Sequence, residues 1–154
     1  MNQLEGRGLA DRRKAATERL RSNRNLWLAT ASDGRGPHMI PLTYCWDGSR
    51  LTTATFEGSR TVKNVRAQPK VRAAIGTPDD VLMIDATATI VPVADIADIP
   101  EVTTRYVQGS GNDPQSMPGF VYIQLVPERI QLWTGVAGFT ERTVMRAGVW
   151  LDDD

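Results

Sequence analysis

Residues 55 to 69 combine a helix start with basic side chains, and this combination can hold an anion. The stretch reads TFEGSRTVKNVRAQP and places Arg60, Lys63 and Arg66 after a Gly-Ser pair. A helix that begins after Ser59 presents free backbone N–H groups and the positive end of its dipole to a ligand. The serine hydroxyl, these N–H groups and two of the cations could therefore converge on a phosphate.

The helical period separates two sides of this segment. Val62 and Val65 fall on one side, where they can anchor the helix, whereas Arg60, Lys63 and Ala67 fall near the opposite side. The alternative is that the serine only caps the helix and that the cations are solvated surface charges. Chemistry alone leaves both interpretations open.

No second set of residues in the sequence forms a recognisable catalytic or metal-binding motif. The chain has one histidine, His38, and one cysteine, Cys45, which are too few for a Ser-His-Asp set or a structural zinc site. His38 stands at the start of a predicted strand, where we expect a hydrogen-bonded structural role. The sequence therefore assigns no catalytic residue.

Length and composition indicate one ordinary domain. The 154 residues include 18 basic and 18 acidic side chains, so the formal net charge is zero and no broad positive field is available for nucleic acid. No window approaches the roughly 18 consecutive apolar residues of a membrane span, and no signal segment is visible at the N-terminus. We therefore expect a soluble, cytoplasmic protein that binds neither nucleic acid nor membrane.

Most of the chain is typical of short strands. Residues 10 to 22 predict an exposed helix with Asp11 as its cap. Strands are predicted over residues 25–31, 38–46, 51–55, 70–76, 81–91, 120–126 and 129–133, helices over 59–67 and 98–108, and a loop over 109–119. Such strands with short helices between them favour a closed or partly open barrel, with a sandwich as the alternative.

The second predicted strand, residues 38 to 46, contains a proline. Alternation directs Ile40, Leu42, Tyr44 and Trp46 to the core and Met39, Pro41, Thr43 and Cys45 to the other face. Pro41 cannot donate a backbone hydrogen bond, so its strand should lie at an edge or be interrupted there. Nearby backbone groups are then free for a ligand or for water.

These motifs together resemble a known family, the pyridoxamine 5'-phosphate oxidase-like, FMN-binding split-barrel superfamily. The resemblance rests on the spacing of Thr55, Ser59, Arg60, Lys63 and Pro69, which matches the phosphate-binding segment of that family. Upstream, LWLATASDGRGPHMIPLTYCWDGSRL resembles the opening hairpin of the family, and RAGVWL resembles the closing Gly-x-Trp-Leu of many small members. The resemblance extends from about residue 26 to residue 150 and is firmest through residue 76.

The resemblance implies a mainly β (α+β) fold, a split β-barrel of six to seven mostly antiparallel strands with short flanking helices. Residues 1–24 would form an N-terminal helical extension and residues 25–154 the flavin-binding barrel. It also implies a homodimer with two cofactor sites at the subunit interface. The implied cofactor is FMN, and the 5-deazaflavin coenzyme of the factor 420 type is the alternative because it shares the ring shape and a phosphate.

The resemblance also assigns residues to that cofactor. The phosphate would be bound by Thr55, Ser59, Arg60 and Lys63, and the ring would be contacted mainly through the backbone of Pro41, Leu42 and Thr43. The sequence departs from the vitamin oxidases, since it has Thr61 in place of a lysine and Val81 about where those enzymes have a glutamine. It also lacks their C-terminal Arg-x-His pair, so oxidation of pyridoxamine 5'-phosphate is not expected.

Three functions are compatible with this sequence. The first is a flavin- or deazaflavin-dependent oxidoreductase that acts on a small organic substrate, with the protein mainly binding and orienting the ring. The alternative is a non-catalytic binder of flavin, haem or a related tetrapyrrole on the same fold. A nucleic-acid-associated role of the basic N-terminal helix is the weakest, because the overall charge is balanced.

Overall fold

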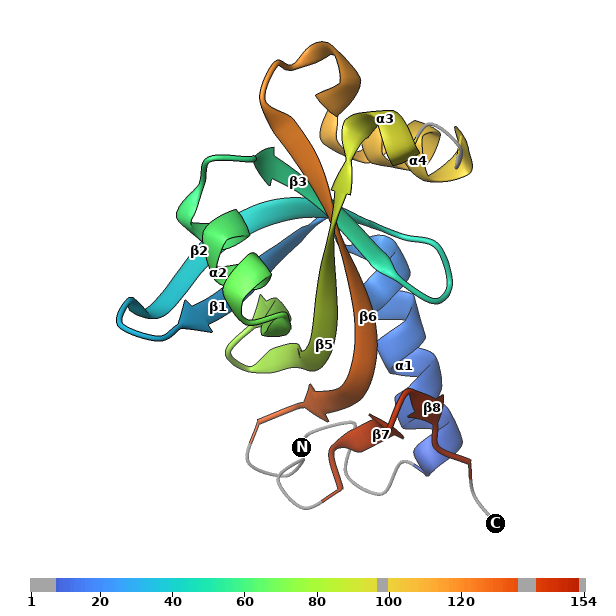
Figure 1. Ribbon diagram of the computed structural model, residues 1–154. Helices are drawn as coiled ribbons and strands as arrows, with labels where there is room; N and C mark the ends of the chain where they lie inside the picture. Colours follow the sequence, from blue (N-terminus) through green and yellow to red (C-terminus); the bar gives the residue numbers. More distant parts are fainter. Residues whose placement is uncertain (1–7, 97–99, 136–140, 153–154) are drawn as a thin grey trace.

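The computed structural model describes residues 8–96, 100–135 and 141–152. In chain order the elements are α1 (Leu9–Ser22), β1 (Asn25–Ser32), β2 (Gly36–Trp46), β3 (Leu51–Phe56), α2 (Arg60–Ala67), β4 (Lys70–Thr77), β5 (Asp80–Pro92), α3 (Val93–Ile96), α4 (Pro100–Ser110), the short 3-10 turn η1 (Pro114–Ser116), β6 (Phe120–Trp133), β7 (Thr143–Arg146) and β8 (Val149–Trp150). Figure 1 shows α2 beside β1, with α3 and α4 together at the opposite end of β6 from β7 and β8.

Six antiparallel strands close into a barrel. Their order is β3-β2-β1-β4-β5-β6, and β3 pairs with β6 to complete the ring, while β7 and β8 extend from the outer end of β6. Closure leaves few free edges along the barrel wall. The predicted barrel is confirmed, and the sandwich alternative is wrong.

Strand β6 is one continuous element where the sequence predicts two. Asp85 of β5 lies opposite Arg129, whereas the next residue, Ala86, lies opposite Pro127, so Glu128 is the extra residue of a bulge. A bulge accommodates a proline, which has no N–H to donate to the neighbouring strand. The strand therefore bends at Pro127 and continues.

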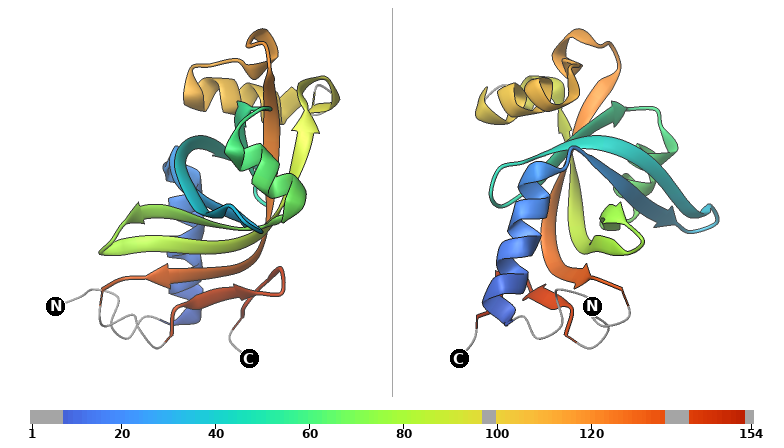
Figure 2. Two further views of the ribbon diagram at one scale, coloured as in Figure 1. Left: turned by 60° about the vertical axis from the view of Figure 1, so that its left-hand side comes forward. Right: turned by 180° about the vertical axis from the view of Figure 1, so that it is seen from behind.

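Helix α1 packs against the barrel, as the views in Figure 2 show, and it is not the exposed helix that the sequence predicts. Ala16 and Leu20 are fully buried in the main core, and the Tyr44 hydroxyl donates a hydrogen bond to the Leu20 carbonyl at 2.9 Å. The helix follows Gly8 rather than a cap at Asp11. Polar and charged residues dominate the sequence of α1, and the apolar stripe that packs against the barrel is narrow.

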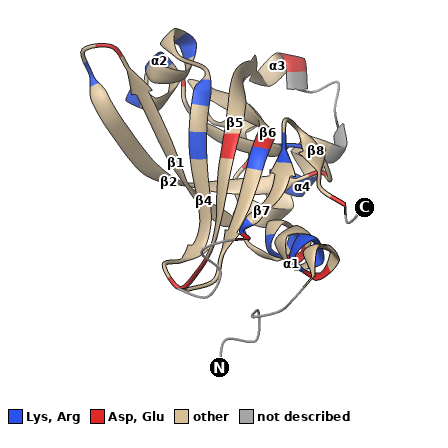
Figure 3. Cartoon of the chain, turned by 90° about the horizontal axis from the view of Figure 1, so that it is seen from below, with Lys and Arg blue, Asp and Glu red and all other residues tan. Residues whose placement is uncertain are grey.

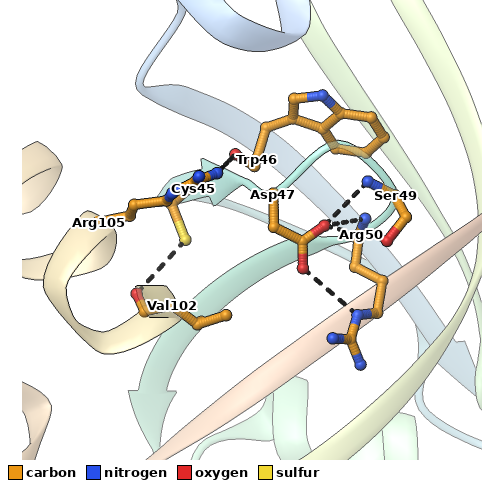
Figure 4. A network of polar contacts seen from close by, with 7 residues as sticks. All are labelled: Cys45, Trp46, Asp47, Ser49, Arg50, Val102 and Arg105. Carbon is orange, nitrogen blue, oxygen red and sulfur yellow. Dashed lines mark hydrogen bonds and ion pairs between the residues drawn. The ribbon is translucent and has the colours of Figure 1, made fainter. Parts of the chain in front are cut away.

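Helix α4 covers the outside of the β2–β3 hairpin, and Figure 4 shows how polar contacts hold the two together. Arg105 donates to the Trp46 carbonyl at 3.3 Å, and the Cys45 thiol lies 3.9 Å from the Val102 carbonyl. Burial raises the pKa of the Cys45 thiol to about 11, so this group stays protonated and inert at neutral pH. The first two residues of the helix predicted over 98–108 lie outside the described residues.

An Asp-Gly pair, which is typical of hairpin turns, lies between β2 and β3. The Asp47 carboxylate accepts hydrogen bonds from the backbone N–H groups of Ser49 and Arg50, at 2.9 and 2.7 Å. Partial burial raises the pKa of Asp47, but these bonds and the nearby Arg50 charge lower it by more, so the net shift is downward. The hairpin is thus fixed by a carboxylate that remains ionised.

Candidate functional site

The predicted anion-binding segment forms the turn after β3 and the start of α2. Ser59 is the N-cap of the helix, and its hydroxyl oxygen accepts a hydrogen bond from the Val62 N–H at 3.2 Å. The Ser59 N–H in turn donates to the Phe56 carbonyl at 3.0 Å, which fixes the turn that enters the helix. This turn therefore fixes the position of the first helical N–H groups, which have no partner within the helix.

The two sides of α2 are as the helical period predicts. Val62 and Val65 are buried in the main core, and Arg60, Lys63 and Ala67 are exposed. Two further side chains of this helix are fully buried, although sequence reasoning gave them no role in anchoring it. These are Thr61 and Asn64.

The basic residues of α2 differ in how their charges are used. Arg66 forms an ion pair with Glu57 at 3.0 Å. Arg60 donates to the backbone carbonyl of Arg35, in the turn between β1 and β2. Within the described part of the chain, neither Arg60 nor Lys63 is paired with a carboxylate. Two of the three cations are thus available to a bound anion, and we call them, with Ser59, the cradle.

The barrel wall is split next to the cradle. Strand β2 pairs with β1 from Gly36 to Thr43, but among the described residues it pairs with β3 only over Tyr44 to Trp46. The expectation that Pro41 lies on an edge is therefore confirmed. The segment 36–43 keeps backbone groups that no neighbouring strand uses, and a ligand or water must satisfy them.

The other assigned residues lie on the two strands that border this split. Pro41 is exposed and lies opposite Trp27 of β1, whereas Leu42 and Thr43 are half-buried. Thr55, near the end of β3, is also half-buried and lies opposite Val121. The bond from Arg60 to the β1–β2 turn brings the start of α2 to the same opening.

The outside of the barrel next to β2 carries an apolar groove of about 450 Å³. Its lining residues come from β1, β2, β4, β5 and β6 and from the turn between β4 and β5. They are Trp27, Met39, Ala74, Gly76, Thr77, Pro78, Val81, Met83 and Trp133. Trp27 and Met39 are 47% and 62% exposed, which is unusual for large apolar side chains that gather on one face of a barrel.

The same outer face becomes charged along β4, β5 and β6, as Figure 3 shows. Asp85 accepts from Arg72 at 2.7 Å and from Arg129 at 2.9 Å, and Lys70 contacts Glu128 at 2.5 Å. Partial burial raises the pKa of Asp85, but the bond from Arg72 and the charges of both arginines lower it by more. We call these five residues the charged strip.

The cradle fits the phosphate of a flavin-type cofactor. It supplies a serine hydroxyl, the free N–H groups of a helix start and two cations without carboxylate partners, and each of these favours a phosphate. The described residues contain no group of three or more His, Cys, Asp or Glu side chains that could hold a metal. The His38 ring makes no hydrogen bond within the described residues, and its strand position lies opposite Thr30.

This fold and this site define a small split-barrel protein in which a capped helix start with exposed cations lies beside an open strand edge. A sequence model described as pyridoxamine 5'-phosphate oxidase matches residues 13–134, so the chain belongs to that family. A comparison of the sequence with curated proteins found no match. No described helix is both long enough and apolar enough to cross a membrane.

Solved structures of similar proteins support the fold. A candidate pyridoxamine 5'-phosphate oxidase from Listeria innocua is 24% identical, with a TM-score of 0.63 over 78% of this chain and 96% of that chain. An F420 reductase is 22% identical, with a TM-score of 0.58 over 73% and 93% of the two chains. A FAD-binding protein from Mesorhizobium loti is 20% identical, with a TM-score of 0.58 over 76% and 90%.

Proposed function

We propose that this protein binds a flavin-type cofactor and acts as an oxidoreductase on a small organic substrate. The observation that carries the proposal is the cradle: Arg60 and Lys63 lie at a Ser59-capped helix start and have no carboxylate partner in the described part of the chain. An exposed cation without a partner is ordinary, but two beside free helix N–H groups and an open strand edge form a site for a ring that carries a phosphate.

In this proposal the protein binds and orients, and the cofactor supplies hydride transfer when it is bound. The Ser59 hydroxyl and Lys63 hold the phosphate, while Arg60 does so from the side of the β1–β2 turn. The unpaired backbone groups of β2 near Pro41 satisfy the polar edge of the ring. No described side chain is required as a dedicated acid or base.

The cofactor is FMN in this proposal, with the 5-deazaflavin coenzyme as the alternative. Both carry a phosphate, so the cradle serves either one. Among similar structures, one is named an F420 reductase and another a FAD-binding protein, which supports a flavin-type ring on this fold. The acidic tail of the deazaflavin would need further cations.

We propose that the active form is a homodimer with the cofactor at the subunit interface. The apolar groove supports this arrangement, because Trp27 and Met39 would be covered by a second copy of the chain rather than left in water. Light scattering at micromolar concentration is expected to give twice the chain mass. A monomer under those conditions would contradict the shared site.

The test of the cofactor is a matched set of titrations. The absorbance spectrum and mass of any co-purified molecule are measured first, and the apo-protein is then titrated with FMN, riboflavin and the deazaflavin coenzyme. We expect FMN to bind at least about tenfold more tightly than riboflavin, since only FMN engages the cradle. Equal affinities would reject the phosphate site, and binding without turnover of any small acceptor would favour the non-catalytic alternative.

Pyridoxamine 5'-phosphate is expected to be a poor substrate. Val81 is buried and lines the apolar groove, so this position offers no side-chain hydrogen bond where the vitamin oxidases have a glutamine. Peroxide formation from this substrate, measured with the FMN-loaded protein, is expected to stay near background. Robust turnover would contradict the prediction.

A further inference from the structure

Asn64 is a buried polar residue that the proposed function does not use. Its side chain is fully buried on the inner side of α2, between Thr61 and Val65. The amide nitrogen donates to the Thr30 hydroxyl at 3.1 Å, and the amide oxygen accepts from the Ser32 hydroxyl at 2.9 Å. Both partners are among the last three residues of strand β1, so one side chain joins α2 to the end of that strand.

These bonds belong to a closed circuit that includes the cradle. Asn64 contacts the side chain of Ser32, and the backbone carbonyl of Ser32 accepts a hydrogen bond from the Arg35 N–H at 3.1 Å. This second bond shapes the turn between β1 and β2. The carbonyl of Arg35 then receives the guanidinium of Arg60, at the start of the same helix that carries Asn64. The path therefore leaves α2 at Asn64 and returns to it at Arg60.

The circuit has a consequence for the cradle arginine. An exposed arginine samples many rotamers, and fixing it on binding costs conformational entropy. The Arg35 carbonyl restricts Arg60 only if the β1–β2 turn is itself held relative to α2. Asn64 supplies that restraint from the buried side of α2, where its bond to Thr30 is buried and its bond to Ser32 is partly buried.

We propose that Asn64 is a positioning residue of the cradle, which holds Arg60 ready for the cofactor phosphate by fixing helix α2 to the β1–β2 turn. The inference rests on the proposed function, since it concerns the same site. Asn64 itself does not touch the cofactor. Its effect is expected in the selectivity for a phosphorylated ring over the same ring without phosphate.

The variants for the test are Asn64→Leu, which removes both hydrogen bonds at similar volume, and Ser32→Ala, which removes one bond from a half-buried position. The matched control is Tyr44→Phe, which deletes another buried hydrogen bond between a helix and the barrel, the one from Tyr44 to Leu20. For each purified protein, the dissociation constants of FMN and riboflavin and the melting temperature are measured.

The ratio of the riboflavin to the FMN dissociation constant is the decisive readout. It is expected to fall about tenfold in Asn64→Leu and about threefold in Ser32→Ala, and to stay within twofold of wild type in Tyr44→Phe even if the melting temperature falls. If Asn64→Leu does not fold, Ser32→Ala decides. An unchanged ratio in the variants, or equal losses for both ligands, would reduce Asn64 to a structural role and overturn the inference.

The same data separate this inference from the proposed function. A riboflavin-to-FMN ratio of dissociation constants near one in the wild type would show that the phosphate does not contribute to binding. Both proposals would then fail together. A high wild-type ratio that survives in Asn64→Leu and Ser32→Ala would leave the cofactor site intact and overturn only the role of Asn64.

Discussion

The cradle and the charged strip both contain arginine and lysine but use these cations in opposite ways. In the charged strip, each of Lys70, Arg72 and Arg129 contacts a carboxylate within 2.9 Å. In the cradle, Arg60 contacts a backbone carbonyl, and no described carboxylate approaches Lys63. A cation that is already paired gains little from a new anion, whereas an unpaired cation gains the full charge-assisted contact. Unpaired cations beside a capped helix start, rather than the number of cations, mark the candidate binding site.

The largest effect is expected from a substitution in the apolar groove, which adjoins the charged strip on the outer face. We propose that a second copy of the chain covers this groove. Trp27→Glu would place an unpaired carboxylate in the proposed subunit interface. We expect the dissociation constant of the dimer to rise at least about a hundredfold. Light scattering over a concentration series measures the change. The control is Val149→Glu on β8, a more exposed apolar residue outside the groove, which should leave the dimer unchanged. A stable Trp27→Glu dimer would exclude this face as the interface.

The next effect tests the cradle itself. Arg60→Ala and Lys63→Ala are each expected to weaken FMN binding by roughly ten- to a hundredfold, since a hydrogen bond to a charged group contributes about 1.5 to 3 kcal/mol. Riboflavin binding should hardly change, because the deleted charge has no phosphate to meet. Fluorescence or calorimetric titration gives both affinities.

The control for these variants comes from the charged strip. Arg72→Ala removes the same charge from a paired position and should leave FMN affinity unchanged. A loss in Arg72→Ala equal to that in Arg60→Ala would show that the overall charge, rather than the cradle, attracts the cofactor. Added salt should weaken FMN binding less steeply in Lys63→Ala than in wild type.

A smaller effect is expected from Ser59→Ala. The substitution removes the N-cap bond to Val62, which costs about 1 kcal/mol of unfolding free energy, and it also removes the hydroxyl offered to the phosphate. Denaturant melts and FMN titrations should both shift. Asp113→Ala, which removes the cap of η1, is the control and should affect stability without affecting FMN. Unaltered FMN affinity in Ser59→Ala would limit Ser59 to capping.

The smallest effect concerns the charged strip and pH. The pKa of Asp85 is lowered in the folded protein, so its contribution to stability is present above about pH 4, the range of an unfolded aspartate, and is lost as pH falls through the folded pKa. Asp85→Asn should therefore lower stability at pH 7 by less than about 1 kcal/mol and flatten the acid side of the pH profile. Urea melts at pH 7 and pH 3 measure both. Parallel profiles for wild type and Asp85→Asn would contradict the assignment.

Local patterns predicted the elements that bear the candidate site. Ser59 as a cap and the spacing of Val62 and Val65 located helix α2 and its exposed cations. Pro41 indicated a strand edge because the missing N–H is a local property. These inferences need no knowledge of which strands become neighbours.

The remaining features depend on contacts between distant residues. Asn64 is of a residue type that is usually exposed, and only its position directly before Val65, on the buried side of the helix, could have indicated burial. The pairing of Arg66 with Glu57 and of Asp85 with two arginines is set by register and turn geometry, so the sequence did not distinguish free from paired cations. The sequence predicts two strands separated near Pro127, whereas β6 is continuous. The bulge that accommodates this proline forms only against the neighbouring strand β5, which local patterns do not reveal.

The closure of the barrel by β6 has a consequence for how the chain folds. Strand β3 pairs with residues 120–125, more than 60 positions further along the sequence, so the ring cannot close until β6 has been synthesised. On the ribosome, the sheet formed by β1 to β5 would expose the outer edges of β3 and β5 together with the apolar interior. Such an open intermediate is prone to associate with other chains, and in this protein the synthesis of a single 14-residue strand ends that risk.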